Sequence, residues 1–212
     1  MSRSQIVATV SVVVLAIFVL AGYLWQQNQT NTAKAVVDSA ALERTYSPSF
    51  GPADAKVTIV EFFDPACEAC RAFYPFVKRI MAEYPEDVRL VLRYTTFHQG
   101  SDEVVRLLEA ARKQDLFEPV LEEVLRRQSD WASHGNPDIS KAWAAAELAG
   151  LDVTRAEKDA QAITVTSLLQ QEATDVKTMQ VEKTPTFFVN GKSLPSFGAQ
   201  QLYDLVSAEV GR

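Results

Sequence analysis

Residues that commonly bind metal ions or nucleic acids are scarce in this sequence. It contains two cysteines, two histidines and three methionines in 212 residues, and it has no Met-rich or His-rich tract. Its 21 basic residues are outnumbered by 27 acidic ones, which gives a net charge of −6 at pH 7. A nucleic-acid partner is therefore not expected, because nucleic-acid-binding domains present a basic surface. We also predict no cofactor and no metal site.

Charge is absent from the N-terminal stretch Ile6–Leu24, which is almost wholly apolar. A helix of this length nearly spans a hydrocarbon core of about 30 Å. Tyr23 and Trp25 lie at its outer end, where aromatic rings favour the membrane interface, and Arg3 precedes it. We therefore predict that residues 1–25 form a signal anchor, a single transmembrane helix whose N-terminus is cytoplasmic. The alternative is cleavage of this segment and secretion.

Either route exports the rest of the chain to an oxidising compartment, where disulfides form and persist. In a bacterium this compartment is the periplasm, and an uncleaved segment would hold the domain at the inner membrane. The chain then runs through a polar stretch to the cluster Ser47–Pro52, whose residues break helices and strands. We predict a tether over residues 26–50 and a folded domain over residues 51–212, which is long enough for a sizeable core.

Apolar periodicity predicts both strands and helices in this domain. Val57–Phe63 is β-branched and apolar, as in a central strand. Cys67–Glu83 has apolar residues at helical spacing, with Pro75 inside, where it should kink the helix. Val88–Thr95 is predicted as a second strand, and a helical block follows over about residues 98–182.

The strand pattern returns near the C-terminus. Thr186–Val189 is followed by Asn190-Gly191, a pair that suits a type I′ hairpin turn, and then by a short second strand. Gln200–Val210 has the apolar spacing of a closing helix. The order of strand, helix, strand, helical block, hairpin and helix predicts an α/β fold with a mixed central sheet, flanking helices and a helical insertion.

The two cysteines, Cys67 and Cys70, lie two residues apart where the first strand turns into a helix. This spacing allows a reversible disulfide or a pair of thiolate metal ligands. At the start of the helix, the unpaired backbone amides and the helix dipole favour a thiolate at Cys67. The thiolate is the nucleophile of disulfide exchange, and Cys70, one turn later and less exposed, could resolve a mixed disulfide.

Three features of residues 51–210 resemble the DsbA-like thiol-disulfide oxidoreductases of the thioredoxin superfamily. They are the strand that leads into Cys67-Glu68-Ala69-Cys70, Pro75 shortly after the second cysteine, and Thr184-Pro185 before the hairpin. The resemblance implies a thioredoxin fold, with a DsbA-like helical insertion in the long separation between Cys70 and Pro185. It also implies that Pro185 is a cis-proline facing the cysteines.

The same resemblance suggests roles for residues around the cysteine pair. The backbone of Thr184 would pair with an extended substrate segment beside Cys67, and Glu68 and Ala69 would lie against that substrate. Glu61 resembles the buried acid of the family, which relays a proton to or from Cys70. Burial on a central strand would raise the pKa of this carboxyl. The alternative for Glu61 is a strand-end glutamate that points to solvent.

The function that these features predict is thiol-disulfide exchange with exported proteins, through mixed disulfides at Cys67 and with a membrane redox partner. DsbA-like enzymes usually have Pro-His between the cysteines, where this chain has Glu68-Ala69. A neighbouring negative charge disfavours the thiolate, so we expect a weaker oxidant than DsbA. His98 follows the second strand in a loop near the predicted site, and its role stays open.

Two other functions remain compatible with the sequence. The thiolate pair could bind Cu(I) as a periplasmic metal-handling module, since soft thiolates select this ion. The dithiol could also serve as a reductase or isomerase in a cytochrome or metal-site assembly pathway. A permanent structural disulfide is a further interpretation, which a reduction potential below about −300 mV would favour.

Overall fold

The computed structural model describes residues 16–23, 39–133 and 135–212, and the chain divides into two compact units, residues 1–36 and residues 37–212. Residues 16–23, in the first unit, are helical. Within the described ranges, no helix combines the length and the apolar character needed to cross a membrane. Most of the predicted anchor helix and the first part of the predicted tether lie outside the described residues.

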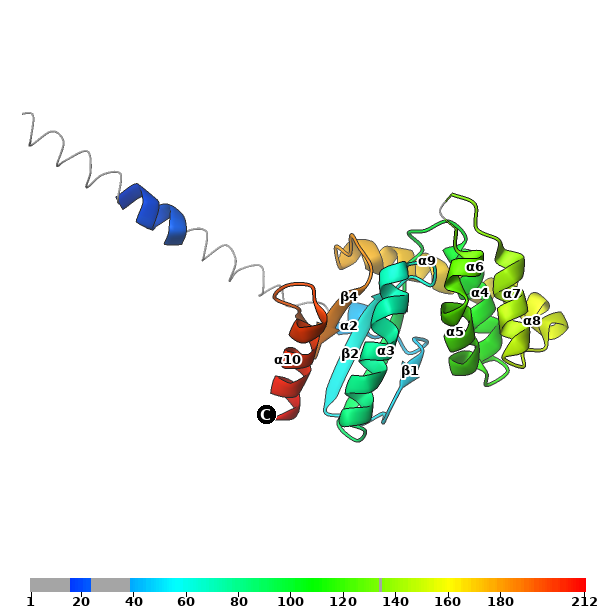
Figure 1. Cartoon of the computed structure of the whole chain (residues 1–212), viewed down its shortest axis with the longest axis horizontal. Coiled ribbons are helices and arrows are strands. Elements are labelled where there is room, and N and C mark those ends of the chain that lie inside the picture. The colour runs from blue at the N-terminus through cyan, green and yellow to red at the C-terminus, as the bar shows by residue number, and fades with distance from the viewer. Residues whose placement is uncertain (1–15, 24–38, 134) are drawn as a thin grey trace, which may run out of the picture. The chain divides into compact units, whose positions relative to one another are not determined.

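A five-stranded mixed sheet forms the centre of the second unit, with the strand order β1-β3-β2-β4-β5 (Figure 1). β2 (Val57–Phe63) is the middle strand, parallel to β3 (Val88–Tyr94) and antiparallel to β4 (Thr186–Val189). All seven residues of β2 are buried, which is expected of an apolar strand covered on both faces. The predicted strands are therefore confirmed.

Helices cover both faces of this sheet because successive residues of β2 point to opposite sides. Ile59 belongs to the core cluster that includes residues of α3 (Glu68–Glu83) and α10 (Ala199–Val210), while Val60 belongs to a second cluster with α9 (Ile163–Thr178). α3 and α10 contact each other, and α9 contacts β3. The sheet therefore lies between two helical layers.

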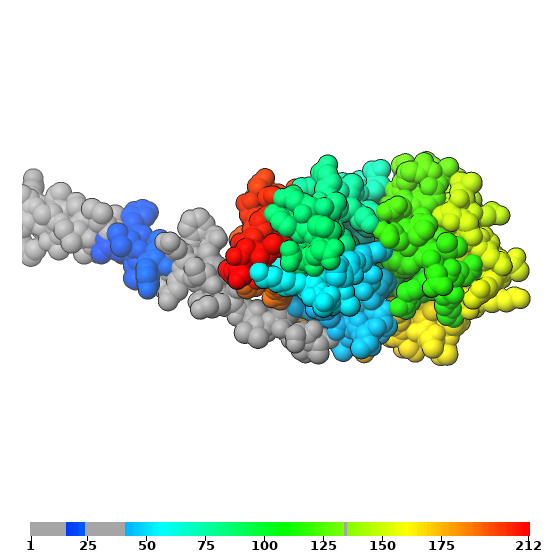
Figure 2. Space-filling view, turned by 90° about the horizontal axis from the view of Figure 1, so that it is seen from below, coloured from blue at the N-terminus to red at the C-terminus, as the bar shows by residue number. Residues whose placement is uncertain are grey.

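The chain between β3 and β4 is helical, within the segment where the sequence predicts an insertion. Helices α4 to α8 gather into a lobe beside the sheet (Figure 1), and their side chains make up one end of the second unit in the space-filling view (Figure 2). The bounds of these helices are α4 Ser101–Arg112, α5 Phe117–Arg126, α6 Gln128–Trp131, α7 Ile139–Leu148 and α8 Val153–Ala160. The chain returns to the sheet through α9.

Part of the predicted tether belongs to the folded unit. Residues of α2 (Ser39–Leu42) contact α9, and β1 (Ser49–Phe50) pairs antiparallel with β3. Arg44 forms an ion pair of 2.6 Å with Asp175, and the side chain of Leu42 is buried. Elements of two to four residues such as these leave no readable periodicity in the sequence.

The hairpin after α9 matches its prediction closely. Asn190 and Gly191 link β4 to β5 (Lys192–Ser193), and their φ angles are 47° and 77°. A type I′ turn needs positive φ at both of these positions, which asparagine and glycine tolerate. β4 pairs directly with β2, and this pairing fixes the segment before β4, which carries Thr184 and Pro185.

Candidate active site

The turn after β2 positions both cysteines. The Asp64 carboxylate accepts a hydrogen bond from the amide of Ala66 at 2.9 Å, and the Cys67 amide donates to the Asp64 carbonyl at 3.0 Å. Cys67 is the N-cap of α3, and Cys70 lies in the first turn of this helix. The exposed fraction is 6% for Cys67 and 0% for Cys70, so both are buried but Cys67 is the nearer to solvent.

A peptide bond from a distant part of the chain lies against Cys67. The Cys67 thiol donates a hydrogen bond of 3.4 Å to the carbonyl oxygen of Thr184, which is 117 positions later in the sequence. The bond between Thr184 and Pro185 is cis, as the resemblance implies. The folded chain therefore brings together Cys67, Cys70, Thr184 and Pro185 at the end of β2.

The two thiols are held at very different pKa values. A hydrogen bond from Cys70 lowers the pKa of Cys67 to about 5, helped by the side chain of Thr184 and by the amides of Cys70 and Ala69 and opposed by burial. Burial raises the pKa of Cys70 far above its usual range, together with its hydrogen bond to Cys67 and the charge of Glu61. Cys67 is thus a thiolate near neutral pH and Cys70 remains a thiol.

Glu61 is fully buried on β2, so the prediction of a buried carboxyl is confirmed. Desolvation raises the pKa of this carboxyl to about 8, and the negative charge of Cys67 adds to the effect. Within the described residues, neither carboxylate oxygen has a hydrogen-bond partner. A buried acid that titrates close to neutral pH can both accept and release a proton there.

Asp64 is a site residue that the sequence analysis missed. Its amide donates to the sulfur of Cys70 at 3.5 Å, while its buried carboxylate accepts from the amides of Phe97 and His98 at 2.8 Å and 3.1 Å. The same carboxylate also accepts from the hydroxyl of Ser101. Asp64 therefore ties the cysteine turn to the loop after β3. An Asp-Pro pair at the end of a buried strand is the signal that could have revealed it.

His98 is one of the residues that contact the Asp64 carboxylate, and its side chain is only partly exposed. Its Nδ1 atom lies 2.9 Å from Oδ2 of Asp64, and its side chain is 35% exposed. The imidazole therefore contacts the residue that holds Cys70, without a hydrogen bond of its own to either sulfur in the described part of the chain. This contact connects the loop after β3 to the turn that leads to the cysteines.

Glu68 and Ala69 sit between the cysteines as expected from the motif. Glu68 is exposed and Ala69 is half-buried, at the start of α3. Solvent screens the charge of an exposed carboxylate, which weakens its influence on the nearby thiolate. The role of both residues in substrate binding stays a prediction.

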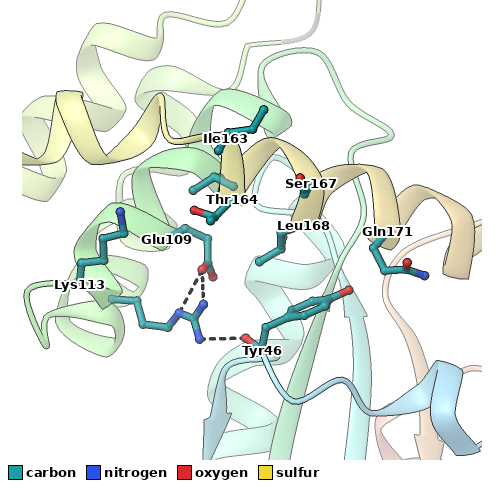
Figure 3. Close-up of a pocket in the computed structure, with 10 residues that line it drawn as sticks. Tyr46, Glu109, Lys113, Ile163, Thr164, Ser167, Leu168 and Gln171 are labelled. Carbon is teal, nitrogen blue, oxygen red and sulfur yellow. Dashed lines mark hydrogen bonds and ion pairs between the residues drawn. The ribbon is translucent and has the colours of Figure 1, made fainter.

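A separate cavity of about 640 Å³ lies between Tyr46, α4 and the first half of α9. In Figure 3, Ile163, Thr164 and Leu168 of α9 line one side of it. Arg112, on the opposite wall, donates to Glu109 and to the carbonyl of Tyr46. The guanidinium group of Arg112 is thus already paired. The residues that line this cavity are not those of the cysteine site.

A cysteine pair at the start of a helix, after the central strand of a mixed sheet and against a cis X-Pro peptide, defines the class of thioredoxin-fold dithiol proteins. The sequence profile of the family described as thioredoxin matches residues 43–207. The chain belongs to this family. Its domain has the architecture of the DsbA-like thiol-disulfide oxidoreductases.

Solved structures agree with this assignment. A thioredoxin-like oxidoreductase from Silicibacter pomeroyi DSS-3 is 28% identical, with a TM-score of 0.71 over 82% of this chain and 99% of that one. BdbD from Bacillus subtilis is 22% identical, with a TM-score of 0.68 over 78% of this chain and 94% of BdbD. The thiol-disulfide exchange protein α-DsbA2 from Wolbachia pipientis is 14% identical, with a TM-score of 0.67 over 80% of this chain and 90% of α-DsbA2. The last two similarities concern the fold alone.

Curated relatives match over a similar region but are much longer. The Na⁺/H⁺ antiporter NhaA from Herminiimonas arsenicoxydans is 33% identical over 144 residues, which are 68% of this chain and 22% of the antiporter. Na⁺/H⁺ antiporter NhaA 1 from Mycobacterium sp. strain KMS is 28% identical over 147 residues, 67% and 23% respectively. The chain thus spans about a fifth of the length of the curated relatives it matches.

Proposed function

We propose that this domain is a thiol-disulfide oxidoreductase that acts on exported proteins through Cys67 and Cys70. The observation that carries the proposal is the environment of Cys67, whose thiol lies 3.4 Å from the Thr184 carbonyl and whose pKa is lowered to about 5. A thiolate at neutral pH is both a nucleophile and a good leaving group in disulfide exchange.

In the oxidising direction, a substrate thiolate attacks the sulfur of Cys67 in the Cys67–Cys70 disulfide. The substrate–Cys67 disulfide forms, the bond between the two cysteines breaks, and the Cys70 sulfur takes up a proton. A second substrate thiolate then attacks the substrate sulfur of this mixed disulfide, which releases an oxidised substrate and the Cys67 thiolate. Two electrons pass to the dithiol, and the reverse sequence reduces a substrate disulfide.

Glu61 is the residue that we assign to proton transfer. The Cys70 thiol must lose a proton whenever it resolves a mixed disulfide, although burial raises its pKa. The Glu61 carboxyl influences Cys70 electrostatically and has a pKa raised to about 8. It can therefore hold the proton of Cys70 within a site where water has little access.

Substrate binding is assigned to the peptide around Pro185. The Thr184 carbonyl, which accepts from Cys67, would also face an extended substrate segment, and backbone pairing of this kind gives affinity without demanding one sequence. Glu68 and Ala69 would lie along the same segment. Such recognition suits an enzyme that acts on many exported proteins.

We further propose an oxidant weaker than DsbA. The pKa of Cys67, about 5, lies between the nucleophile pKa values of DsbA, about 3.5, and thioredoxin, about 7. A less stabilised thiolate makes the reduced form less favoured and the reduction potential lower. The potential follows from equilibration with glutathione buffers, and a value above about −150 mV would contradict this part of the proposal. The redox partner sets the direction of electron flow.

The proposed location is the outer face of a bacterial inner membrane, with residues 1–25 as a single-pass anchor and a membrane redox partner nearby. The apolar stretch Ile6–Leu24 supports this placement. Curated relatives that are named as Na⁺/H⁺ antiporters contain a region similar to this domain.

Replacement of each cysteine tests the chemistry. In the full chain, Cys67→Ser should abolish exchange with a reduced or oxidised protein substrate, because the nucleophile is lost. Cys70→Ser should instead accumulate mixed disulfides, since the second thiol that resolves them is gone. Non-reducing electrophoresis after acid quenching detects these adducts. Full activity in both variants would rule out the proposed dithiol mechanism.

A further inference from the structure

A second cavity lies on the α9 face of the sheet, close to the cysteine pair, and the mechanism above does not use it. Its volume is about 580 Å³, within the range of sites that bind peptides and small molecules. We refer to it as the α9 pocket, and its walls include Thr95, Phe97, Leu169, Ala173, Val176 and Val181. Its apolar residues come from α9, from the loop after β3 and from the segment that leads to Pro185.

A buried hydroxyl sets the α9 pocket apart from an ordinary surface hollow. Thr95 is 2% exposed, and its Oγ1 atom has no hydrogen-bond partner among the residues that the structure describes. An unpaired buried polar atom is costly and calls for a ligand group that can pair with it. Glu172, which also lines the pocket, already accepts from Arg93. Among the polar residues that line the pocket, Thr95 is therefore a buried one whose hydroxyl is available to pair with a ligand.

Both walls of the α9 pocket continue into segments that hold the sulfurs. On one side, the amide of Phe97 donates to Asp64, and the amide of Asp64 donates to the sulfur of Cys70. On the other side, Glu182 lines the pocket and lies two positions before Thr184, whose carbonyl accepts from Cys67. Two residues span at most about 7 Å, so the Cα atom of Glu182 is within roughly 13 Å of the Cys67 sulfur.

We propose that the α9 pocket receives an apolar side chain of the exported polypeptide, three or four residues from its reacting cysteine. This inference rests on the proposed function, because it needs a polypeptide joined to Cys67. An extended chain advances about 3.3 Å per residue, so three or four residues cover the distance from Cys67 to the rim. The exposed ring of Phe97 would cover the apolar side chain, and the Thr95 hydroxyl would pair with the peptide backbone.

The test measures how fast a peptide thiol displaces a coloured thiol from Cys67. The full chain with Cys70→Ser is loaded at Cys67 with 5-thio-2-nitrobenzoate through a mixed disulfide. The peptide thiolate attacks the Cys67 sulfur, the peptide–Cys67 disulfide forms, and the coloured thiolate leaves, so one disulfide replaces another. Peptides with one cysteine and either leucine or glycine three or four residues away are compared with glutathione.

We expect the leucine peptides to react about tenfold faster than the glycine peptides, relative to glutathione. Ala173→Trp places a large ring from the exposed face of α9 into the pocket and should abolish this preference. Thr95→Val removes only the hydroxyl and should lower the rate of both kinds of peptide severalfold. The matched control is Ala144→Trp, an exposed helix position in a different hollow on α7, which should keep the full preference.

Two kinds of failure are distinguishable in this assay. If glutathione displaces the coloured thiol from Cys67 no faster than from a free cysteine disulfide, the proposed function fails. If glutathione reacts quickly but the leucine preference is absent, or persists unchanged in Ala173→Trp, the α9 pocket is not a polypeptide subsite. A preference lost equally in Ala144→Trp would also overturn the inference.

Discussion

At the residue scale, the Glu61 carboxyl near the cysteines is an ionisable group that burial keeps from its usual charged state. It is fully buried, and the described residues supply no hydrogen bond to either of its oxygens. Ionisation of an unpaired carboxyl in such a place is costly, so the proton is retained to higher pH. An apolar side chain at this position would stabilise the fold more than a buried, unpaired carboxyl does. Stability therefore does not explain the glutamate, and we assign Glu61 to proton transfer.

This retention of the proton predicts the pH dependence of stability. The unfolded chain releases the Glu61 proton near pH 4.5, whereas the folded domain retains it to about pH 8. Stability due to the neutral carboxyl is fully present below about pH 4.5 and is lost as the pH rises through about 8. In the oxidised protein, which lacks the contribution of the Cys67 thiolate to this shift, Glu61→Gln should still raise the free energy of unfolding relative to the wild type, by up to about 4 kcal/mol more at pH 9 than at pH 4.

Urea unfolding of the wild type and of Glu61→Gln across this pH range measures the difference. Glu86→Gln, at an exposed carboxylate, is the matched control and should leave the pH profile nearly unchanged. Parallel profiles for the wild type and Glu61→Gln would mean that Glu61 titrates normally in the folded domain.

At the scale of elements, α9 is joined to the sheet by buried charges. Arg93 of β3 is fully buried and donates to Glu172 at 3.1 Å and to Asp175 at 2.6 Å, both on α9. Arg44, in the segment before β1, also bonds to Asp175. Since α9 is followed by the segment that carries Thr184, these ion pairs help to fix the peptide that lies against Cys67.

Removal of the central cation should destabilise the fold strongly. Arg93→Met keeps an unbranched apolar stem, although a shorter one, and leaves Glu172 buried without its cationic partner, so the free energy of unfolding should fall by about 3–5 kcal/mol at pH 7. The double variant with Glu172→Gln should recover part of this loss, because the uncompensated charge is gone. Urea unfolding checks both values.

The control for this pair is Arg126→Met, which removes an exposed arginine that is paired with Glu123 in the same way. Exposed ion pairs contribute little, so its effect should stay below about 1 kcal/mol. A loss in Arg93→Met as small as that in Arg126→Met would show that the buried ion pairs do not stabilise the attachment of α9.

At the scale of the whole molecule, the proposed function depends on where the domain works. We expect the full chain to remain with bacterial membranes after an alkaline carbonate wash, because an apolar helix of this length stays in the hydrocarbon core. A variant in which a cleavable signal peptide replaces residues 1–25 should appear in the soluble periplasmic fraction. Recovery of the wild type as a soluble protein that lacks its N-terminal segment would contradict the anchor and indicate secretion.

The amino-acid sequence by itself determined the local parts of the site. The run of β-branched residues before Cys67 specified β2, the apolar spacing after it specified α3, and Asn190-Gly191 specified the hairpin. Each of these signals depends on neighbours within one strand, one helix or one turn. The position of Cys67 at the beginning of a helix follows from them directly.

Only the tertiary structure decided which distant groups meet at the cysteines. Asp64 joins Cys70 to the loop after β3, and Arg93 lies buried only because α9 brings two carboxylates to it. Short elements such as β1 became visible through their pairing with another strand. These contacts join positions far apart in the chain, and they form when burial of the apolar faces packs the helices onto the sheet. The spacing of residues in the sequence does not predict which distant residues this packing brings into contact.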